Sequence, residues 1–198
     1  MLPPAVRLPP VARTSASRNK KPRQMGLSIS YQLATRGSQE EVRRRMEQWH
    51  EQITNLPGYH LSDLRVMPDD IGFFVRCGDG AELARLRLRR DSEELWQGSW
   101  DCKTQFAGRP ENGGPENFMA THCRLVTVLD LGLALGLVES VNDDGNFWTD
   151  RQTGRLLERF DAFQNAVALM VGLAKQAGLA ADILAVKPHE NHLKIVGS

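Results

Sequence analysis

Cysteine is scarce in this chain, and its small number bears on the compartment. The 198 residues include only three cysteines, Cys77, Cys102 and Cys123. Three thiols cannot pair completely, and no secretory signal with an apolar segment opens the chain. Since disulfides persist mainly in oxidising compartments, we expect a reducing, cytoplasmic setting.

Long apolar runs are also lacking. The longest, residues 125–137, is interrupted by Thr127, Asp130 and two glycines. A membrane-spanning helix needs about 20 apolar residues, so this run is too short. We expect a buried core helix here and no membrane partner.

The recognised metal and nucleotide motifs are missing as well. No C-x-x-C or H-x-x-H spacing exists, and helical geometry places His122 and Cys123 on different sides of one helix. The stretch 142–146 lacks the alternating acidic pattern of a calcium loop, and no P-loop occurs. We therefore expect no metal site and no cofactor.

Charge is nearly balanced overall but unevenly placed. Of the 25 basic residues, six lie within residues 1–24, which contain no acid and five prolines, and the remaining 19 face 24 acidic residues. We expect residues 1–24 to be a disordered basic tail and residues 25–198 to form a single domain. The tail fits a nucleic-acid arm, an organelle transit peptide, a basic linker, or a sequence upstream of a true start at Met25.

Periodicity predicts the elements of the domain. A capping box at Ser38 and Glu41 starts a helix, Pro115 starts a second, and a long apolar stripe beginning at Leu156 marks a third, which Gly178 ends. Alternation predicts strands at residues 27–35, 81–90 and 95–106, and a closing strand at 182–187. Two hairpins are also predicted, one formed by residues 61–67 and 71–77 and one around residues 143–145. Consecutive strands favour an α+β fold, a mainly antiparallel sheet of about six to eight strands with three helices packed on one face.

Strand 95–106 has the clearest alternation. Trp96, Trp100, Cys102 and Phe106 share one face, and their odd-numbered polar neighbours share the other. Cys102 is therefore expected to be a small core residue rather than a reactive thiol. On the next strand back, Arg85, Arg87 and Arg89 share one face; they suit phosphate contacts, but nearby carboxylates favour a solvated, salt-bridged face.

An anion site is predicted where strand 95–106 meets the N-terminus of helix 115–135. Free helix amides and the positive end of the helix dipole attract anions, and two basic side chains would reinforce them. The candidate ligand-binding residues are Lys103, Gln105, Arg109, Gly113, Gly114 and Asn117. The alternative, which we hold level with it, is that Glu116 satisfies the helix end and Lys103 is solvated.

Three residues are candidates for acid–base chemistry. His122 falls on the apolar stripe of the helix, which is more typical of a hydrogen-bonded core histidine. Asp130 is the one carboxylate in the run 125–137, and either a buried base or the wetter edge of the helix explains it, the second being favoured. Asp101 lies on the polar face of strand 95–106.

Four sequence elements resemble those of a group of uncharacterised bacterial proteins. They are CKTQFA, GGPENFMATHC, LDLGLALG and VNDDGNFWTDR. The resemblance covers about residues 26–178 as one domain and implies a bacterial, cytoplasmic protein. It implies no activity and no catalytic residue.

The sequence favours a soluble binding or interaction module, whose partner is a small anionic molecule or a protein. The alternative is a small enzyme that acts on an anionic metabolite, held by Lys103 and Arg109 with Asp101, His122 or Asp130 as acid or base. Nucleic-acid binding through the tail and the arginine strand is the least favoured function, because the body of the chain is mildly acidic.

Overall fold

The structure, a computed structural model, describes residues 27–177. The elements follow in the order β1 (Ser28–Arg36), α1 (Gln39–Thr54), β2 (His60–Leu61), β3 (Arg65–Met67), β4 (Asp70–Arg76), β5 (Ala84–Arg90), β6 (Leu95–Lys103), η1 (Gln105–Gly108), η2 (Pro110–Asn112), α2 (Gly114–Ala134), β7 (Val138–Asp143), α3 (Phe147–Asp150) and α4 (Thr153–Gln176).

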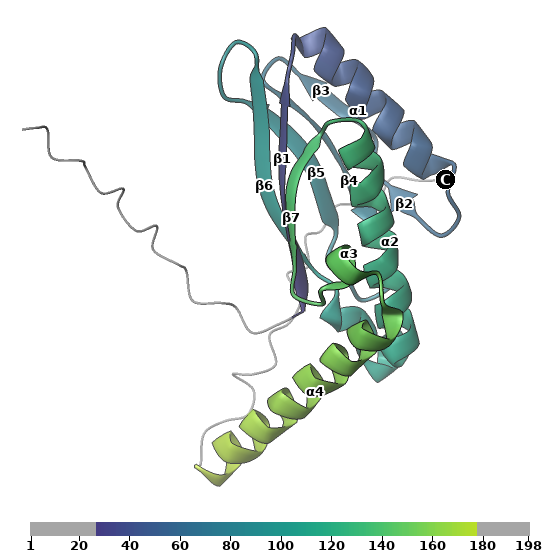
Figure 1. The fold of residues 1–198 in the computed structure, drawn as a ribbon, viewed down its shortest axis with the longest axis vertical. Coiled ribbons are helices and arrows are strands. Elements are labelled where there is room, and N and C mark those ends of the chain that lie inside the picture. The colour runs from purple at the N-terminus through teal and green to yellow at the C-terminus, as the bar shows by residue number, and fades with distance from the viewer. Residues whose placement is uncertain (1–26, 178–198) are drawn as a thin grey trace, which may run out of the picture.

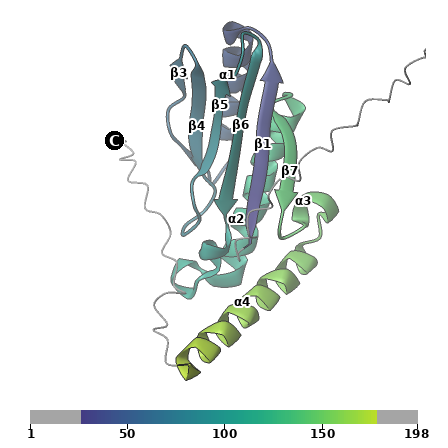
Figure 2. The same ribbon diagram turned by 90° about the vertical axis from the view of Figure 1, so that its left-hand side faces the viewer.

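The strands form one seven-stranded sheet in which every pair is antiparallel. Its order is β2-β4-β5-β6-β1-β7, and the short β3 also pairs with β4. Helices α1 and α2 lie against one face of the sheet (Figure 1), and Figure 2 looks onto the other face. The third long helix, α4, packs against α2 and α3 at the lower end of the sheet. The prediction of an α+β fold with a mainly antiparallel sheet is confirmed.

Helix α1 begins at the predicted capping box. The Ser38 hydroxyl accepts from the Glu41 amide, and the Glu41 carboxylate accepts from the Ser38 amide at 2.8 Å. Its buried residues follow at helical spacing: Val42, Met46, Trp49 and Ile53. The local sequence therefore sets both the start of this helix and the face that it buries.

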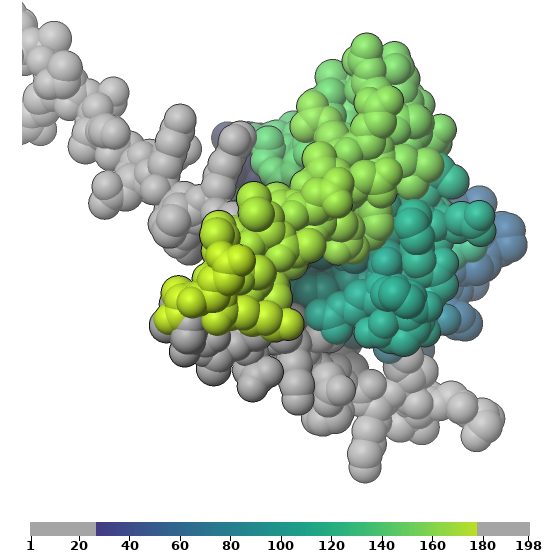
Figure 3. Space-filling view, turned by 90° about the horizontal axis from the view of Figure 1, so that it is seen from below, coloured from purple at the N-terminus to yellow at the C-terminus, as the bar shows by residue number. Residues whose placement is uncertain are grey.

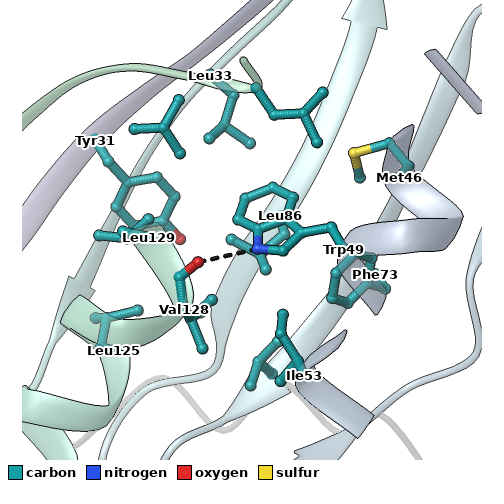
Figure 4. Packing of buried hydrophobic residues seen from close by; sticks show 14 of the residues in the cluster. Tyr31, Leu33, Met46, Trp49, Ile53, Phe73, Leu86, Leu125, Val128 and Leu129 are labelled. Carbon is teal, nitrogen blue, oxygen red and sulfur yellow. Dashed lines mark hydrogen bonds between the residues drawn. The ribbon is translucent and has the colours of Figure 1, made fainter. Parts of the chain in front are cut away.

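The main core lies between the sheet and the two helices (Figure 4). Trp49 of α1 is fully buried, and its indole N–H donates to the Val128 carbonyl of α2 at 2.9 Å. A Cβ added at Gly132 would collide with the Trp49 ring, so the absence of a side chain there lets α1 and α2 approach closely.

A smaller cluster fixes the beginning of α4. The rings of Phe118 and Phe160 stack with centroids 4.3 Å apart, and Leu156 is buried beside them. Burial of side chains of this size contributes about 1.5–3 kcal/mol each. The first turns of α4 are thereby anchored to α2.

The predicted strand 95–106 is too long. The alternation holds from Leu95 to Lys103, with Cys102 buried, but the chain then turns into the 3-10 helix η1. Gln105 therefore does not continue the polar face of the strand and is only 8% exposed.

The predicted hairpin around residues 143–145 is wrong. Residues 138–143 form the single strand β7, and the short helix α3 follows. The Asp143 carboxylate accepts from the amides of Gly145 and Trp148 at 2.7 and 2.8 Å, and Asn146 adopts a left-handed conformation. These contacts coil the chain, so a returning strand cannot form.

The tail 1–24, Gly178 and the predicted closing strand 182–187 lie outside the described residues. Within residues 27–177, no helix has the length and apolar character that crossing a membrane requires.

Candidate functional site

The predicted anion site lies at the lower end of β6. Lys103 is partly exposed at the end of the strand, and its amide donates to the Glu82 carboxylate at 3.0 Å. Gln105 is buried in η1, where its Oε1 has no hydrogen-bond partner in the described structure. The guanidinium carbon of Arg109 lies 5.0 Å from the centre of the Phe106 ring.

The amides that were expected to bind an anion are already used. Gly113 donates to the Pro110 carbonyl at 3.2 Å, and Gly114 donates to the Arg109 carbonyl at 3.0 Å. Pro115 has no N–H, so of the unpaired donors at the start of α2 only the Glu116 amide is left. An anion at this helix end could therefore accept a hydrogen bond from one backbone amide rather than from several.

The Asn117 side chain joins two loops to α2. Its side-chain amide donates to the Asp79 carbonyl at 3.0 Å and to the Ala107 carbonyl at 3.1 Å. Both of its donors are thus used in holding η1 and the loop after β4 against α2. The structure brings Asn117 close to η1 but assigns it to the fold.

A buried polar network lies deeper, centred on His122 of α2. Its Nδ1 is 2.8 Å from the Thr104 hydroxyl oxygen, and its Nε2 is 3.0 Å from Asp143 Oδ1 in a bent contact. Thr104 and His122 are 0% exposed, and the Asp143 side chain is 1% exposed. Each ring nitrogen therefore lies beside a polar group, the hydroxyl at Nδ1 and the carboxylate at Nε2, although the Nε2 contact lacks hydrogen-bond geometry.

The Asp143 carboxylate is held in its charged form. Burial acts to raise the pKa of Asp143, but the hydrogen bond from His122, its positive charge when protonated, and the amides of Trp148 and Gly145 outweigh burial and lower that pKa below its ordinary value. Thr104, His122 and Asp143 come from three separate segments of the chain. The network therefore ties together β6, α2 and the end of β7.

The order hydroxyl, imidazole, carboxylate is also the order of a hydrolase triad. A nucleophile must reach the carbonyl of a substrate, and Thr104 is completely covered in this structure. The arrangement is accordingly suited to joining elements of the fold, which is the role expected of a hydrogen-bonded core histidine.

The other two acid–base candidates lie at the surface. Asp130 forms a two-pronged ion pair with Arg151, both contacts being 2.8 Å, and its side chain is 42% exposed. Asp101 is exposed on the outer face of β6. The structure does not gather Asp101, His122 and Asp130 into one site.

The cysteines have no disulfide partner. Burial raises the pKa of Cys77 to about 12 and that of Cys102 well above its ordinary value, and it also raises the pKa of Cys123. A thiolate nucleophile needs the opposite shift, so Cys77 and Cys102 are packing residues.

A strongly charged surface lies on the sheet face opposite α1 and α2. Within residues 27–177 no helix crosses this face (Figure 2). Along β4 and β5 the core-facing side chains alternate with side chains that point to this side of the sheet. We define the arginine face as the outward residues of β3, β4 and β5: Arg65, Met67, Asp70, Gly72, Phe74, Arg76, Arg85, Arg87 and Arg89.

The arginine face has five guanidinium groups and one carboxylate. Asp70 forms ion pairs with Arg87 and, at 3.6 Å, with Arg89. Within the described part of the chain, no carboxylate is within ion-pair distance of Arg65, Arg76 or Arg85. Salt bridges therefore form at Arg87 and Arg89, but their partner is Asp70 rather than the carboxylates nearby in sequence that were expected.

Register explains why these residues meet. Arg87 pairs with Gly72, which in turn pairs with Arg65, so a glycine separates two arginines across three strands. Arg85 pairs with Phe74. Sequence reasoning missed Arg65 and Arg76 because strands β3 and β4 had to be aligned before their outward positions could be compared with β5.

Comparison with known proteins adds no assignment: no family model, no curated protein and no solved structure matches this chain.

Proposed function

We propose that the protein is a binding module that recognises an anionic polymer through the arginine face. The observation that carries the proposal is the strand register, which places five arginines and one aspartate on the β3, β4 and β5 part of a sheet face that no described helix covers, with Asp101 on the neighbouring strand β6. The opposite face of the sheet is filled by the hydrophobic core, so, in the described part of the chain, this is the sheet face that a large ligand can reach.

The charge of the rest of the molecule strengthens this argument. Residues 25–198 have 19 basic and 24 acidic residues, so the arginine face is positive although this part of the chain has a net negative charge. Guanidinium groups bind phosphate, sulfate and carboxylate oxygens through planar paired donors. A local excess of four positive charges therefore selects an anionic ligand with repeated charges rather than a single small ion.

The function proposed here needs no catalytic group. It agrees with the buried Thr104, His122 and Asp143, which are closed to substrate, and with the occupied amides of Gly113 and Gly114. We also propose a reducing, cytoplasmic setting, which the unpaired thiols of the three cysteines support.

The test is polyanion binding by the full chain as a function of salt. Fluorescence anisotropy measures the affinity for labelled oligothymidylate, with unlabelled heparin and poly-glutamate as competitors. The logarithm of the binding constant should fall linearly with the logarithm of salt concentration. The triple variant Arg65→Gln, Arg76→Gln and Arg85→Gln keeps the aliphatic stems, and it should bind at least about tenfold more weakly with a salt slope smaller by about 1 per arginine.

A matched control removes the same charge elsewhere. Arg44→Gln, Arg155→Gln and Arg159→Gln change three exposed arginines on α1 and α4, and they should leave the affinity nearly unchanged. A second control neutralises Lys20, Lys21 and Arg23 of the basic segment. The proposed function is refuted if the first control loses as much affinity as the triple variant, or if only the second control loses affinity. It is also refuted if the protein binds no polyanion at low salt.

A further inference from the structure

Arg85 differs from its neighbours on the arginine face. Its guanidinium carbon lies 4.7 Å from the centre of the Trp100 ring and 5.5 Å from the centre of the Phe74 ring. Both aromatic residues are partly exposed. A planar cation that lies against two rings is a stacking surface as well as a charge.

An interruption of the sheet brings Trp100 to this position. The ladder between β5 and β6 pairs Arg89 with Gln97 and Arg90 with Trp96 and does not continue. Beyond it the Trp100 indole N–H donates to the Arg87 carbonyl at 2.9 Å. A Cβ on Gly98 would collide with that carbonyl, so only glycine leaves room for this contact.

Tyr31 also forms hydrogen bonds where the ladder between β5 and β6 is interrupted. The Tyr31 hydroxyl accepts from the Arg85 amide at 3.0 Å and donates to the Arg85 carbonyl at 3.1 Å. Tyr31 and Trp100 thus replace the missing hydrogen bonds between two strands. Both the amide and the carbonyl of Arg85 are hydrogen-bonded to Tyr31, so the backbone position from which the Arg85 side chain extends toward the Trp100 ring is fixed.

Positive charges continue from this stacking surface along β5. Alternate side chains on one strand face are about 6.6 Å apart, so Arg87 and Arg89, which share the carboxylate of Asp70, follow Arg85 in a row. A single nucleic-acid strand offers one phosphate per nucleotide and unpaired bases with free faces. Proteins bind such strands by combining basic residues with aromatic or guanidinium surfaces on which bases stack.

We propose that the ligand of the arginine face is single-stranded nucleic acid, with a base stacked at the cluster of Phe74, Arg85 and Trp100 and with phosphates along the arginine row. This inference rests on the proposed function, because it names the class of polyanion that the same surface binds. A duplex is disfavoured because its bases are already stacked on one another. An acidic protein supplies charge but has no bases to stack.

The experiment separates bases from charge. The full chain is titrated with oligothymidylate and with an abasic oligonucleotide of the same length and charge, at one salt concentration. One stacked base should make the thymidylate bind about tenfold more tightly than the abasic strand. Arg85→Lys keeps the charge but removes the planar stacking surface, so it should reduce this preference.

Arg87→Lys is the matched control, because it makes the same change one position along the row and should keep the preference. Phe74→Leu, which removes a ring but keeps an apolar side chain, provides a second variant and should reduce the preference. Circular dichroism checks that each variant is folded.

The outcomes distinguish the two proposals. If thymidylate and abasic strands bind equally well, or if duplex DNA or poly-glutamate binds as tightly as the single strand, the inference is overturned while the proposed function stands. If none of these polyanions binds at low salt, both fail.

Discussion

His122 is the residue at which distant parts of the chain meet. It contacts Thr104 from the segment after β6 and Asp143 from the end of β7. A buried carboxylate without partners would be costly, but Asp143 has a histidine and two amides. The network therefore stabilises the fold only while the carboxylate is charged.

Asp143→Asn should lower the free energy of unfolding at neutral pH by about 1.5–3 kcal/mol, because it weakens hydrogen bonds to a charged group. The folded pKa of Asp143 is lowered, so the unfolded chain binds its proton first as pH falls. The stabilisation from Asp143 is therefore fully present above the ordinary pKa of about 3.9 and is lost as the pH falls through the lower folded value. Urea unfolding between neutral pH and the acid range measures this loss.

Asp130→Asn is the control for this measurement. It removes an exposed carboxylate whose ion pair with Arg151 contributes at most about 1 kcal/mol. If Asp143→Asn and Asp130→Asn have the same free energy of unfolding at neutral pH and lose it equally toward acid pH, the buried network contributes nothing to stability.

At the scale of elements, α2 organises the lower half of the molecule. Its first turns contact η1 and η2, and Asn117 joins two loops to it through two hydrogen bonds. Arg124, farther along the helix, donates to the Cys77 carbonyl at 3.1 Å. The loop between β4 and β5 is therefore held to α2 by side chains rather than by backbone pairing alone.

Asn117→Ala should destabilise the protein by about 1–3 kcal/mol, because it leaves two loop carbonyls without their donor. Asn117→Asp should cost more, since a carboxylate cannot donate and would face two carbonyl oxygens. Chemical denaturation with circular dichroism measures both. Glu116→Ala, an exposed change in the same turn, should stay within about 0.5 kcal/mol. An Asn117→Asp variant as stable as the wild type would contradict the assigned role.

At the scale of the whole molecule, α4 is divided into two parts. Leu156 and Phe160 are buried, whereas Leu169 and Leu173 are 65% and 56% exposed. Figure 3 shows the helix lying across the lower end of the molecule. Residues 162–174 contain no charged side chain, so this half is apolar although the main core does not include it.

Replacing both Leu169 and Leu173 by Gln should change the free energy of unfolding by no more than about 0.5 kcal/mol per site, as for other surface substitutions. Leu156→Ala, in the same helix, should cost about 2–5 kcal/mol because it opens a cavity beside Phe118. Thermal unfolding at several protein concentrations measures both. A large loss from the double glutamine variant would mean that these leucines are covered in solution.

Much of the fold was predictable because its signals are local. The capping box at Ser38, the buried stripe of α1, and the alternation from Trp96 to Cys102 depend on neighbours within a few residues. The prediction failed after Lys103 and after Asp143, where the chain direction depends on hydrogen bonds to particular side chains and on distant partners. Periodicity contains no information about such contacts.

The amino-acid sequence by itself determined the α+β class, the main helices and strands, and which side of strand β6 faces the core, because hydrophobic periods of 3.6 and 2 residues require those faces to be buried. Only the tertiary structure decided which polar residues meet. Strand register set Arg65, Arg76 and Arg85 on one open face, and the close approach of α2 to η1 and β7 enclosed His122. Both results depend on pairing between segments far apart in the chain, and a local pattern does not specify that pairing.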